Sequence, residues 1–388
     1  MKLGVGFILT LAVALFVLAA PQCIAGEKDL TKELGLFFDN EAKRSVTFPK
    51  TKDGAKPAFD IIILHVCSLG WDDMEKAEIN GGGFFKKFDF VFTKFNTVTS
   101  HSGPAAIRLL RSACGQPRHG NLYNKAPNEC YLFENLAKAG FTTEVAFNHD
   151  GKYGGFTEDV TERGNVSAKP MDVSSLPQKS LLFDGSPIYG DYDTLDKWLE
   201  NRTARPSDSF ALYYNTITLH DGTHDAGEKQ WWKKDRGTRF KDNLARLFAG
   251  FEKFFARMES MGRKAIVIFA AEHGKGLRGN GAQKPGERTI PSPDLTKAPL
   301  AIKLIGLPKI EHAVIDKPVG HLAMAYLIAS FLNHNPFTSE SFSFDSILKN
   351  APETRPVADN GEAIVMESEG VYYVNTGKGW EPLPGKHN

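Results

Sequence analysis

Short, dense runs of apolar residues alternate along the chain with segments in which apolar residues recur every three or four positions. The runs lie at 59–66 (FDIIILHV), 142–147 (TTEVAF), 209–217 (SFALYYNTI), 264–271 (KAIVIFAA) and 298–305 (APLAIKLI). Runs this short that are apolar on both faces are typical of central parallel strands. We therefore expect each of them to form a strand of one sheet.

Three segments between these runs have the spacing of helices. Residues 103–113 contain Pro104, which suits a first helical turn, and residues 239–260 and 320–332 carry apolar stripes at helical spacing. Residues 362–380 instead predict two antiparallel strands. This alternation predicts an α/β fold with a largely parallel central sheet, helices on both of its faces and a small C-terminal β-hairpin region.

The N-terminus carries an export signal. Residues 3–20 form an apolar run after Lys2, and small residues within 23–25 precede Gly26, as a signal peptidase requires. We expect residues 1–25 to be a cleaved signal peptide; a single-span anchor is the alternative, because the run approaches the length that crosses a bilayer. Both place the rest of the chain outside the cytoplasm.

Composition narrows the possible functions. The 388 residues carry 47 Lys and Arg against 46 Asp and Glu, and this formal charge of +1 argues against nucleic acid as a partner. Only four cysteines occur, too few for a disulfide scaffold. Residues 26–57 form a mixed, charged N-terminal segment that leads into the body at 58–388, which is long enough for one large α/β domain.

Chemically active side chains stand where the predicted strands end. Cys67 follows the first strand, Glu272 and His273 follow a later one, His220 follows a third, and Ser102 precedes a predicted helix. The carboxyl ends of parallel strands meet at one edge, where ligands of such sheets bind. Thiolate, imidazole and carboxylate suit Zn²⁺ better than Mg²⁺, and a helix N-terminus favours an anionic phosphate or alkoxide.

Each of these residues also has a structural interpretation. A cysteine after a buried strand is commonly a small core residue, and a serine before a helix is commonly an N-cap. His220 and His224 fit ordinary loop histidines as well, and residues 231–232 (WW) fit either an exposed loop or a sugar-stacking platform. Spacing alone leaves these alternatives open.

Longer motifs decide in favour of a site. They run collinearly from about residue 58 to the C-terminus and include CSLGWDD at 67–73, FNTVTSHSGPA at 95–105, NHDG at 148–151, LHDG at 219–222 and EHG at 272–274. In these motifs the chain resembles the bacterial cellulose phosphoethanolamine transferases, the BcsG family. The resemblance implies an alkaline-phosphatase-like fold. It also implies that residues 58–388 form a zinc-dependent catalytic domain, which transfers phosphoethanolamine from a phospholipid to cellulose hydroxyls.

The resemblance also assigns roles to individual residues. Cys67, Ser102, Glu272 and His273 match the zinc-binding positions of the family, and Ser102 matches its nucleophile. In this mechanism the serine attacks the lipid phosphodiester, carries phosphoethanolamine covalently and passes it to a sugar hydroxyl.

Three further positions match residues around the substrate. His220 and Arg288 match residues that contact the phosphoryl group, where they would stabilise its charge. His101 stands where we expect tyrosine, so we expect it to contact substrate differently; His101 and His220 are both candidate bases.

The resemblance implies phosphatidylethanolamine as donor, a glucan such as cellulose as acceptor, contact with a membrane surface, and subunits of cellulose synthase as candidate partners. The implied location is the periplasm, soluble or held at the inner membrane. Two other functions share these residues: a soluble zinc phosphodiesterase or phosphatase of the same fold, and a non-catalytic polysaccharide-binding scaffold.

The resemblance implies that Cys67 binds zinc, and the other three cysteines can then be assigned. Cys23 belongs to the export signal, which leaves Cys114 and Cys130 in an oxidising compartment. We predict a disulfide between these two.

Overall fold

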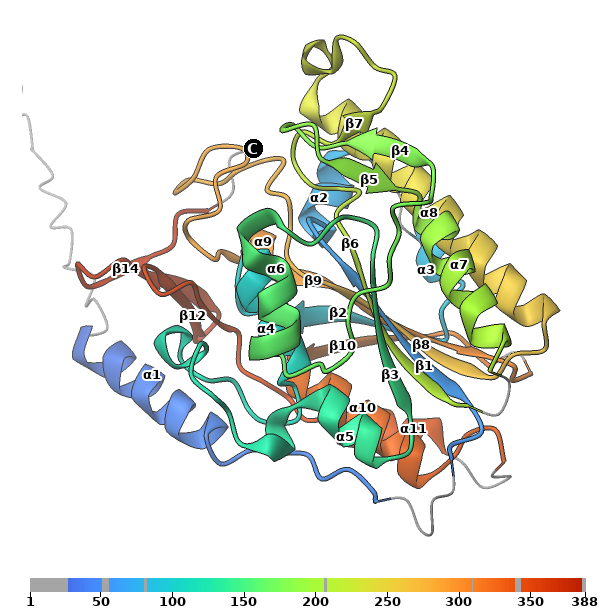
Figure 1. The fold of residues 1–388 in the computed structure, drawn as a ribbon. Helices are drawn as coiled ribbons and strands as arrows, with labels where there is room; N and C mark the ends of the chain where they lie inside the picture. Colours follow the sequence, from blue (N-terminus) through green and yellow to red (C-terminus); the bar gives the residue numbers. More distant parts are fainter. Residues whose placement is uncertain are drawn as a thin grey trace, which may run out of the picture.

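The computed structural model describes residues 27–50, 56–79, 82–205, 208–308, 310–338 and 343–385. The predicted signal peptide or anchor at 1–25 lies outside these residues. At the centre is a seven-stranded sheet in the order β10-β2-β9-β8-β1-β6-β3 (Figure 1). Its strands are β1 (Asp60–Val66), β2 (Phe90–Asn96), β3 (Thr142–Phe147), β6 (Phe210–Thr216), β8 (Ala265–Ala271), β9 (Lys297–Ile305) and β10 (Ala313–Val319).

The sheet is largely parallel, as the sequence predicts. All five apolar runs form strands at the predicted places, but β9 runs antiparallel to both of its neighbours, β2 and β8. Two strands, β2 and β10, were not predicted. The edge strand β10 contains Pro318 and has no fully buried run, so its sequence lacks the pattern of a central strand.

Helices cover both faces of the sheet (Figure 1). One face packs against α4 (Ser102–Leu110), α5 (Leu132–Lys138), α10 (His321–Asn333) and α11 (Phe344–Asn350). The other face packs against α2 (Trp71–Lys76), α3 (Gly82–Phe85), α7 (Asp191–Thr203) and α8 (Arg236–Ser260). Helix α8 begins earlier than predicted because Asp235 caps it, accepting a hydrogen bond from the Thr238 N–H at 2.9 Å.

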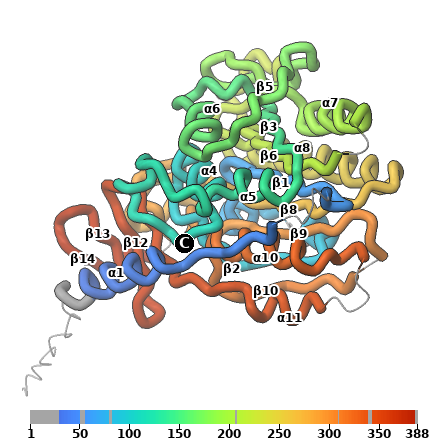
Figure 2. Tube along the Cα trace, turned by 60° about the horizontal axis from the view of Figure 1, so that its bottom comes forward, coloured from blue at the N-terminus to red at the C-terminus, as the bar shows by residue number. Residues whose placement is uncertain are grey.

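The predicted C-terminal hairpin is part of a four-stranded antiparallel sheet: β11 (Val357–Asp359), β12 (Ile364–Ser368), β13 (Val371–Asn375) and β14 (Trp380–Pro382). Helix α1 (Glu27–Glu41) lies along this sheet (Figure 2). Its buried Leu30, Leu34 and Phe38 share a core with Val357 and Met366. The N-terminal segment thus packs against the end of the chain.

The remaining elements are short. A three-stranded sheet consists of β4 (Gln178–Leu181), β5 (Pro187–Tyr189) and β7 (His224–Asp225), and the short helices are α6 (Phe156–Glu158) and α9 (Pro293–Thr296). Within the described ranges, no helix combines the length and the apolar character needed to cross a membrane.

The predicted disulfide between Cys114 and Cys130 is confirmed. It closes a loop of sequence separation 16 that follows α4 and precedes α5. The backbone of Cys114 also bridges to Ser45, so this loop contacts the segment that follows α1. The bond therefore fastens a long irregular stretch to two helices.

We predict that the double variant Cys114→Ser/Cys130→Ser lowers the free energy of unfolding by about 3 kcal/mol, because the unfolded chain regains the entropy of an open loop. Urea denaturation followed by circular dichroism measures this. Reduced wild-type protein is the matched control and should unfold at the same urea midpoint as the variant. Equal midpoints for the oxidised wild type and the variant would contradict the prediction.

Candidate metal and nucleophile site

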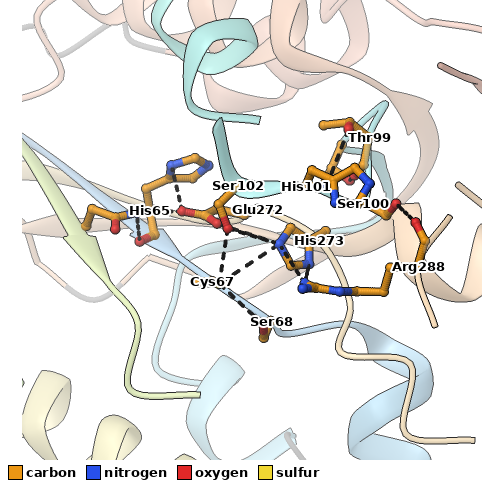
Figure 3. A network of polar contacts seen from close by, with 12 residues as sticks. His65, Cys67, Ser68, Thr99, Ser100, His101, Ser102, Glu272, His273 and Arg288 are labelled. Atoms are coloured by element: carbon orange, nitrogen blue, oxygen red, sulfur yellow. Dashed lines mark hydrogen bonds and ion pairs between the residues drawn. The ribbon is translucent and has the colours of Figure 1, made fainter. Parts of the chain in front are cut away.

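The sequence-predicted residues Cys67, Ser102, Glu272 and His273 meet at the carboxyl edge of the sheet (Figure 3). Strands β1 and β8 pair in register up to their last residues, so the residues that follow them lie side by side. The Ser102 Oγ, at the first residue of α4, lies 3.4 Å from the Cys67 Sγ and 3.2 Å from the His273 Nε2. A thiol, an imidazole and a hydroxyl therefore converge on one point.

Cys67, Glu272 and His273 form a group that can hold a metal ion. Their candidate ligand atoms lie within 4.8 Å of one another, and all three side chains are fully buried. Burial raises the pKa of the Cys67 thiol to about 12 and that of Glu272 to about 7, and it lowers the pKa of His273 well below its usual value. Burial thus opposes the thiolate and the carboxylate that a bound cation would favour, and it keeps the imidazole neutral, the form that binds a metal.

The orientation of these donors fits a metal. The His273 Nδ1 lies 2.8 Å from the Gly274 carbonyl, so Nδ1 donates a proton there and the lone pair of Nε2 faces Cys67 and Ser102. The Glu272 Oε2 is buried and has no hydrogen-bond partner among the residues described. Orphaned buried carboxylate oxygens are costly, and coordination would satisfy this one. The donor set suits a borderline-soft divalent ion.

A second layer of polar residues orients Glu272. Asn215, at β6, donates its amide N–H to the Glu272 Oε1 at 2.5 Å, and its own oxygen lies 2.9 Å from the His149 Nε2. The backbone N–H of Gly151 donates to the His149 Nδ1 at 3.0 Å, so His149 carries its proton on Nε2 and donates it to Asn215. This chain of hydrogen bonds determines which face of the Asn215 amide meets the carboxylate.

The loop that precedes Ser102 has an unusual backbone. Val98 has a φ of 71°, a left-handed conformation that β-branched residues rarely adopt. The side-chain oxygen of Asn96 accepts the Val98 N–H at 3.0 Å, and the Val98 carbonyl accepts the Asp359 N–H at 2.8 Å. Such strain persists only where surrounding contacts determine the conformation, and here it precedes Ser102 by a few residues.

Asn360, which follows β11, fastens this loop to the segment of Arg288. Its side-chain oxygen accepts the Thr99 hydroxyl at 2.8 Å, and its amide donates to the Ser100 Oγ at 2.7 Å. The same amide lies within 3.2 Å of the carbonyls of Arg288 and Thr289. One side chain therefore joins three segments that are far apart in the sequence.

Asp73 performs a similar function on the opposite side of the site. Its buried carboxylate accepts N–H groups from Gly70, Lys275 and Leu277 at 3.0, 2.5 and 2.9 Å. The loop after Cys67 is thereby tied to the loop after His273. The approach is close: a Cβ on Gly274 would lie 2.8 Å from the Asp294 carbonyl oxygen.

A cavity of about 250 Å³ opens above Ser102 and is lined by all three predicted substrate residues, His101, His220 and Arg288. The Arg288 Nη1 lies 3.2 Å from the His273 ring. The His220 Nδ1 donates to the Asp221 carbonyl at 3.0 Å. Burial lowers the pKa of both His101 and His220, which keeps these rings neutral and able to accept a proton near pH 7.

The structure thus brings together every residue of the predicted site. Only the disulfide cysteines lie elsewhere, as expected. Asn215 lay in a predicted strand and was given no role, and Asn360 was not singled out at all. No local pattern marks Asn360, because its partners lie more than 70 residues away in the chain.

Comparisons with known proteins agree with this architecture. A protein of the alkaline phosphatase superfamily from Vibrio parahaemolyticus superposes with a TM-score of 0.61 at 12% identity, covering 91% of this chain and 88% of that one. The C-terminal periplasmic domain of EcEptC from Escherichia coli, solved in complex with Zn, superposes with a TM-score of 0.57 at 12% identity, covering 82% and 93%. The fold is that of the alkaline phosphatase superfamily.

Sequence comparison identifies the family within that class. The family model "Cellulose biosynthesis protein BcsG C-terminal domain" matches residues 18–380. The cellulose biosynthesis protein BcsG of Escherichia coli strain K12 is 39% identical over 362 residues, which cover 92% of this chain and 63% of that protein. The chain belongs to the BcsG family and spans less than two thirds of the length of this curated relative.

We predict that Asn360→Ala lowers the free energy of unfolding by about 1–3 kcal/mol, because it removes the hydrogen bonds to the buried Thr99 and Ser100 and to the backbone carbonyls at 288–289. Urea denaturation measures the loss. Asn201→Ala is the matched control, since Asn201 is exposed and its amide donates to the Met171 sulfur at 3.6 Å. An Asn360→Ala protein as stable as the control would show that the junction contributes nothing.

Proposed function

We propose that the protein is a zinc-dependent phosphoethanolamine transferase, with Ser102 as nucleophile and an exopolysaccharide, cellulose, as acceptor. The observation that carries the proposal is the convergence of Cys67, Glu272 and His273 on the Ser102 hydroxyl at the start of α4. A cysteine that only packs in the core, or a serine that only caps a helix, does not require these side chains beside it. Membership of the BcsG family supports cellulose synthesis as the setting.

Cys67, Glu272 and His273, with the Ser102 oxygen, would hold the zinc ion. Bound zinc supplies Lewis acidity: it lowers the pKa of the serine hydroxyl and polarises phosphoryl oxygens. The Ser102 oxygen then attacks phosphorus of phosphatidylethanolamine. A bond forms between this oxygen and phosphorus, the bond to the diacylglycerol oxygen breaks, and diacylglycerol leaves with a proton.

Residues around the cavity stabilise the phosphoryl group and move protons. The Arg288 guanidinium, beside His273, offers charge and N–H donors to phosphoryl oxygens. Ser102 and Gly103 begin α4, where backbone N–H groups have no acceptor within the helix and favour an anion. His220 and His101 both line the cavity, and either ring can take the proton of the acceptor hydroxyl.

In the second step a glucan hydroxyl attacks the phosphoserine and restores Ser102. In this proposal the reaction takes place outside the inner membrane, because the donor headgroup and the emerging polysaccharide meet there. The periplasm, contact with the membrane surface and proximity to cellulose synthase subunits follow from this proposal. The predicted signal peptide or anchor at 1–25 is consistent with it.

We expect incubation with a phosphatidylethanolamine analogue to produce a phosphoethanolamine adduct on Ser102 that disappears when cello-oligosaccharide is added. Intact mass and peptide mapping follow the adduct, and Ser102→Ala should abolish it. Ser112→Ala is the control, because Ser112 follows the end of α4 and is not among the residues that line the cavity. An adduct lost equally fast in water alone would make the protein a hydrolase, and turnover by Ser102→Ala would exclude the covalent mechanism.

Zinc binding should tighten as pH rises. Without metal, burial holds the pKa of Cys67 at about 12, so the thiol is protonated near pH 7 and must release its proton to become a ligand. Each released proton makes the apparent affinity about tenfold tighter per pH unit, and Glu272, with a pKa of about 7, adds to the effect below pH 7.

Calorimetric zinc titrations at several pH values, in buffers of different protonation enthalpy, measure both the affinity and the protons released. Cys67→Ser should bind zinc more weakly and release fewer protons. An affinity that does not change between pH 6 and pH 8 would exclude the thiol as a ligand.

A further inference from the structure

A single carboxylate, that of Asp159, lines the cavity above Ser102 in the described part of the chain. Asp159 opens a π-helical turn (Asp159–Arg163), in which the Gly164 N–H reaches back to the Asp159 carbonyl at 2.8 Å. Single π-helical turns are frequent at functional sites, because they re-aim a side chain. The Asp159 side chain is only 8% exposed, so its charge needs a partner.

The two oxygens of this carboxylate face different ways. The Oδ1 accepts a hydrogen bond from the Arg163 guanidinium. The Oδ2 lies against the first turn of α4, so close that a Cβ on Gly103 would stand 2.4 Å from it. Gly103 directly follows the nucleophile, and its lack of a side chain leaves Oδ2 room beside Ser102. One oxygen thus anchors the residue and the other borders the reaction site.

The charges around the cavity form a pair. Arg288 supplies the cation, beside His273. Arg288 is the one lysine or arginine among the described residues that line the cavity. Arg288 and Asp159 therefore give one cavity a positive and a negative group. Phosphoethanolamine carries the complementary pair, a phosphoryl anion and a primary ammonium separated by two methylene groups.

We propose that Asp159 binds the ammonium group of the ethanolamine headgroup while the phosphoryl group lies between Ser102 and Arg288. This inference rests on the proposed function and names the part of the donor that the cavity selects. Tyr153, a residue that also lines the cavity and is 57% exposed, supplies an aromatic side chain of the kind that attracts ammonium groups. A headgroup without the ammonium gives the Asp159 Oδ2 no partner, and the buried, unpaired oxygen disfavours binding of that headgroup.

The competing interpretation is that Asp159 serves only as an ion-pair partner of Arg163. The chain offers a matched control, because Glu158 accepts from the same guanidinium at 2.6 Å. Glu158 has a side chain 49% exposed and does not line the cavity. Asp159→Asn and Glu158→Gln therefore each remove one anionic partner of Arg163, and only the first changes the cavity.

The test compares two chromogenic diesters, p-nitrophenyl phosphoethanolamine and the uncharged-headgroup analogue p-nitrophenyl ethyl phosphate, with the full chain loaded with zinc. We expect Asp159→Asn to lower kcat/KM about ten- to hundredfold for the first substrate, and to change that for the second less than about twofold. Glu158→Gln should preserve the wild-type ratio. An equal loss on both substrates, or no loss on either, would overturn the proposal.

Equilibrium binding separates this proposal from the proposed function. Calorimetry with O-phosphoethanolamine and ethyl phosphate should show tighter binding of the first to the wild type, and loss of that preference in Asp159→Asn. A protein that turns over neither diester but shows this preference would contradict the transferase and retain the ammonium site. A wild type without the preference would overturn the ammonium site even if it transfers phosphoethanolamine.

Discussion

The structure depends on one expensive arrangement: a carboxylate, Glu272, held at the end of a central strand with none of its surface in water. A buried acid is tolerated only with compensating partners. Asn215 donates a hydrogen bond to the Glu272 Oε1, and the His65 Nδ1 lies 3.6 Å from the same oxygen. The Oε2 lies 3.8 Å from the His273 Nε2, within the group that could hold a metal ion. Parallel pairing of β8 with β1, and of β1 with β6, brings these partners to the same level of the sheet.

The loops around the site are held by polar side chains, because apolar packing ends where the strands end. Asp73 gathers three backbone N–H groups, and Asn360 joins the loop before Ser102 to the segment of Arg288. Hydrogen bonds of this kind are directional, whereas hydrophobic contacts are not. They position the hydroxyl and the guanidinium within a small tolerance while leaving the cavity between them open.

Local patterns in the sequence predicted the parts of the fold that are locally encoded. The apolar runs predicted five strands, and the family resemblance, not local pattern, assigned the candidate metal ligands, Ser102 and the cavity residues; the disulfide followed from the two cysteines that remained and the oxidising compartment. The direction of β9, the edge strand β10 and the size of the C-terminal sheet depend on pairing between distant segments. The roles of Asn360 and Asp159 depend on residues that approach only in the folded chain, so no spacing rule reveals them.

Helix α1 braces the C-terminal sheet against the loops near Ser102. Its apolar side is packed into the C-terminal sheet, its last residue Glu41 accepts the Gln116 N–H at 2.8 Å, and the same sheet carries Asn360 to the loop of the nucleophile. The described chain therefore begins, at residue 27, in a helix that is packed on this sheet. Because α1 packs on the sheet that holds Asn360, a change in the packing of α1 would be transmitted to the loop before Ser102.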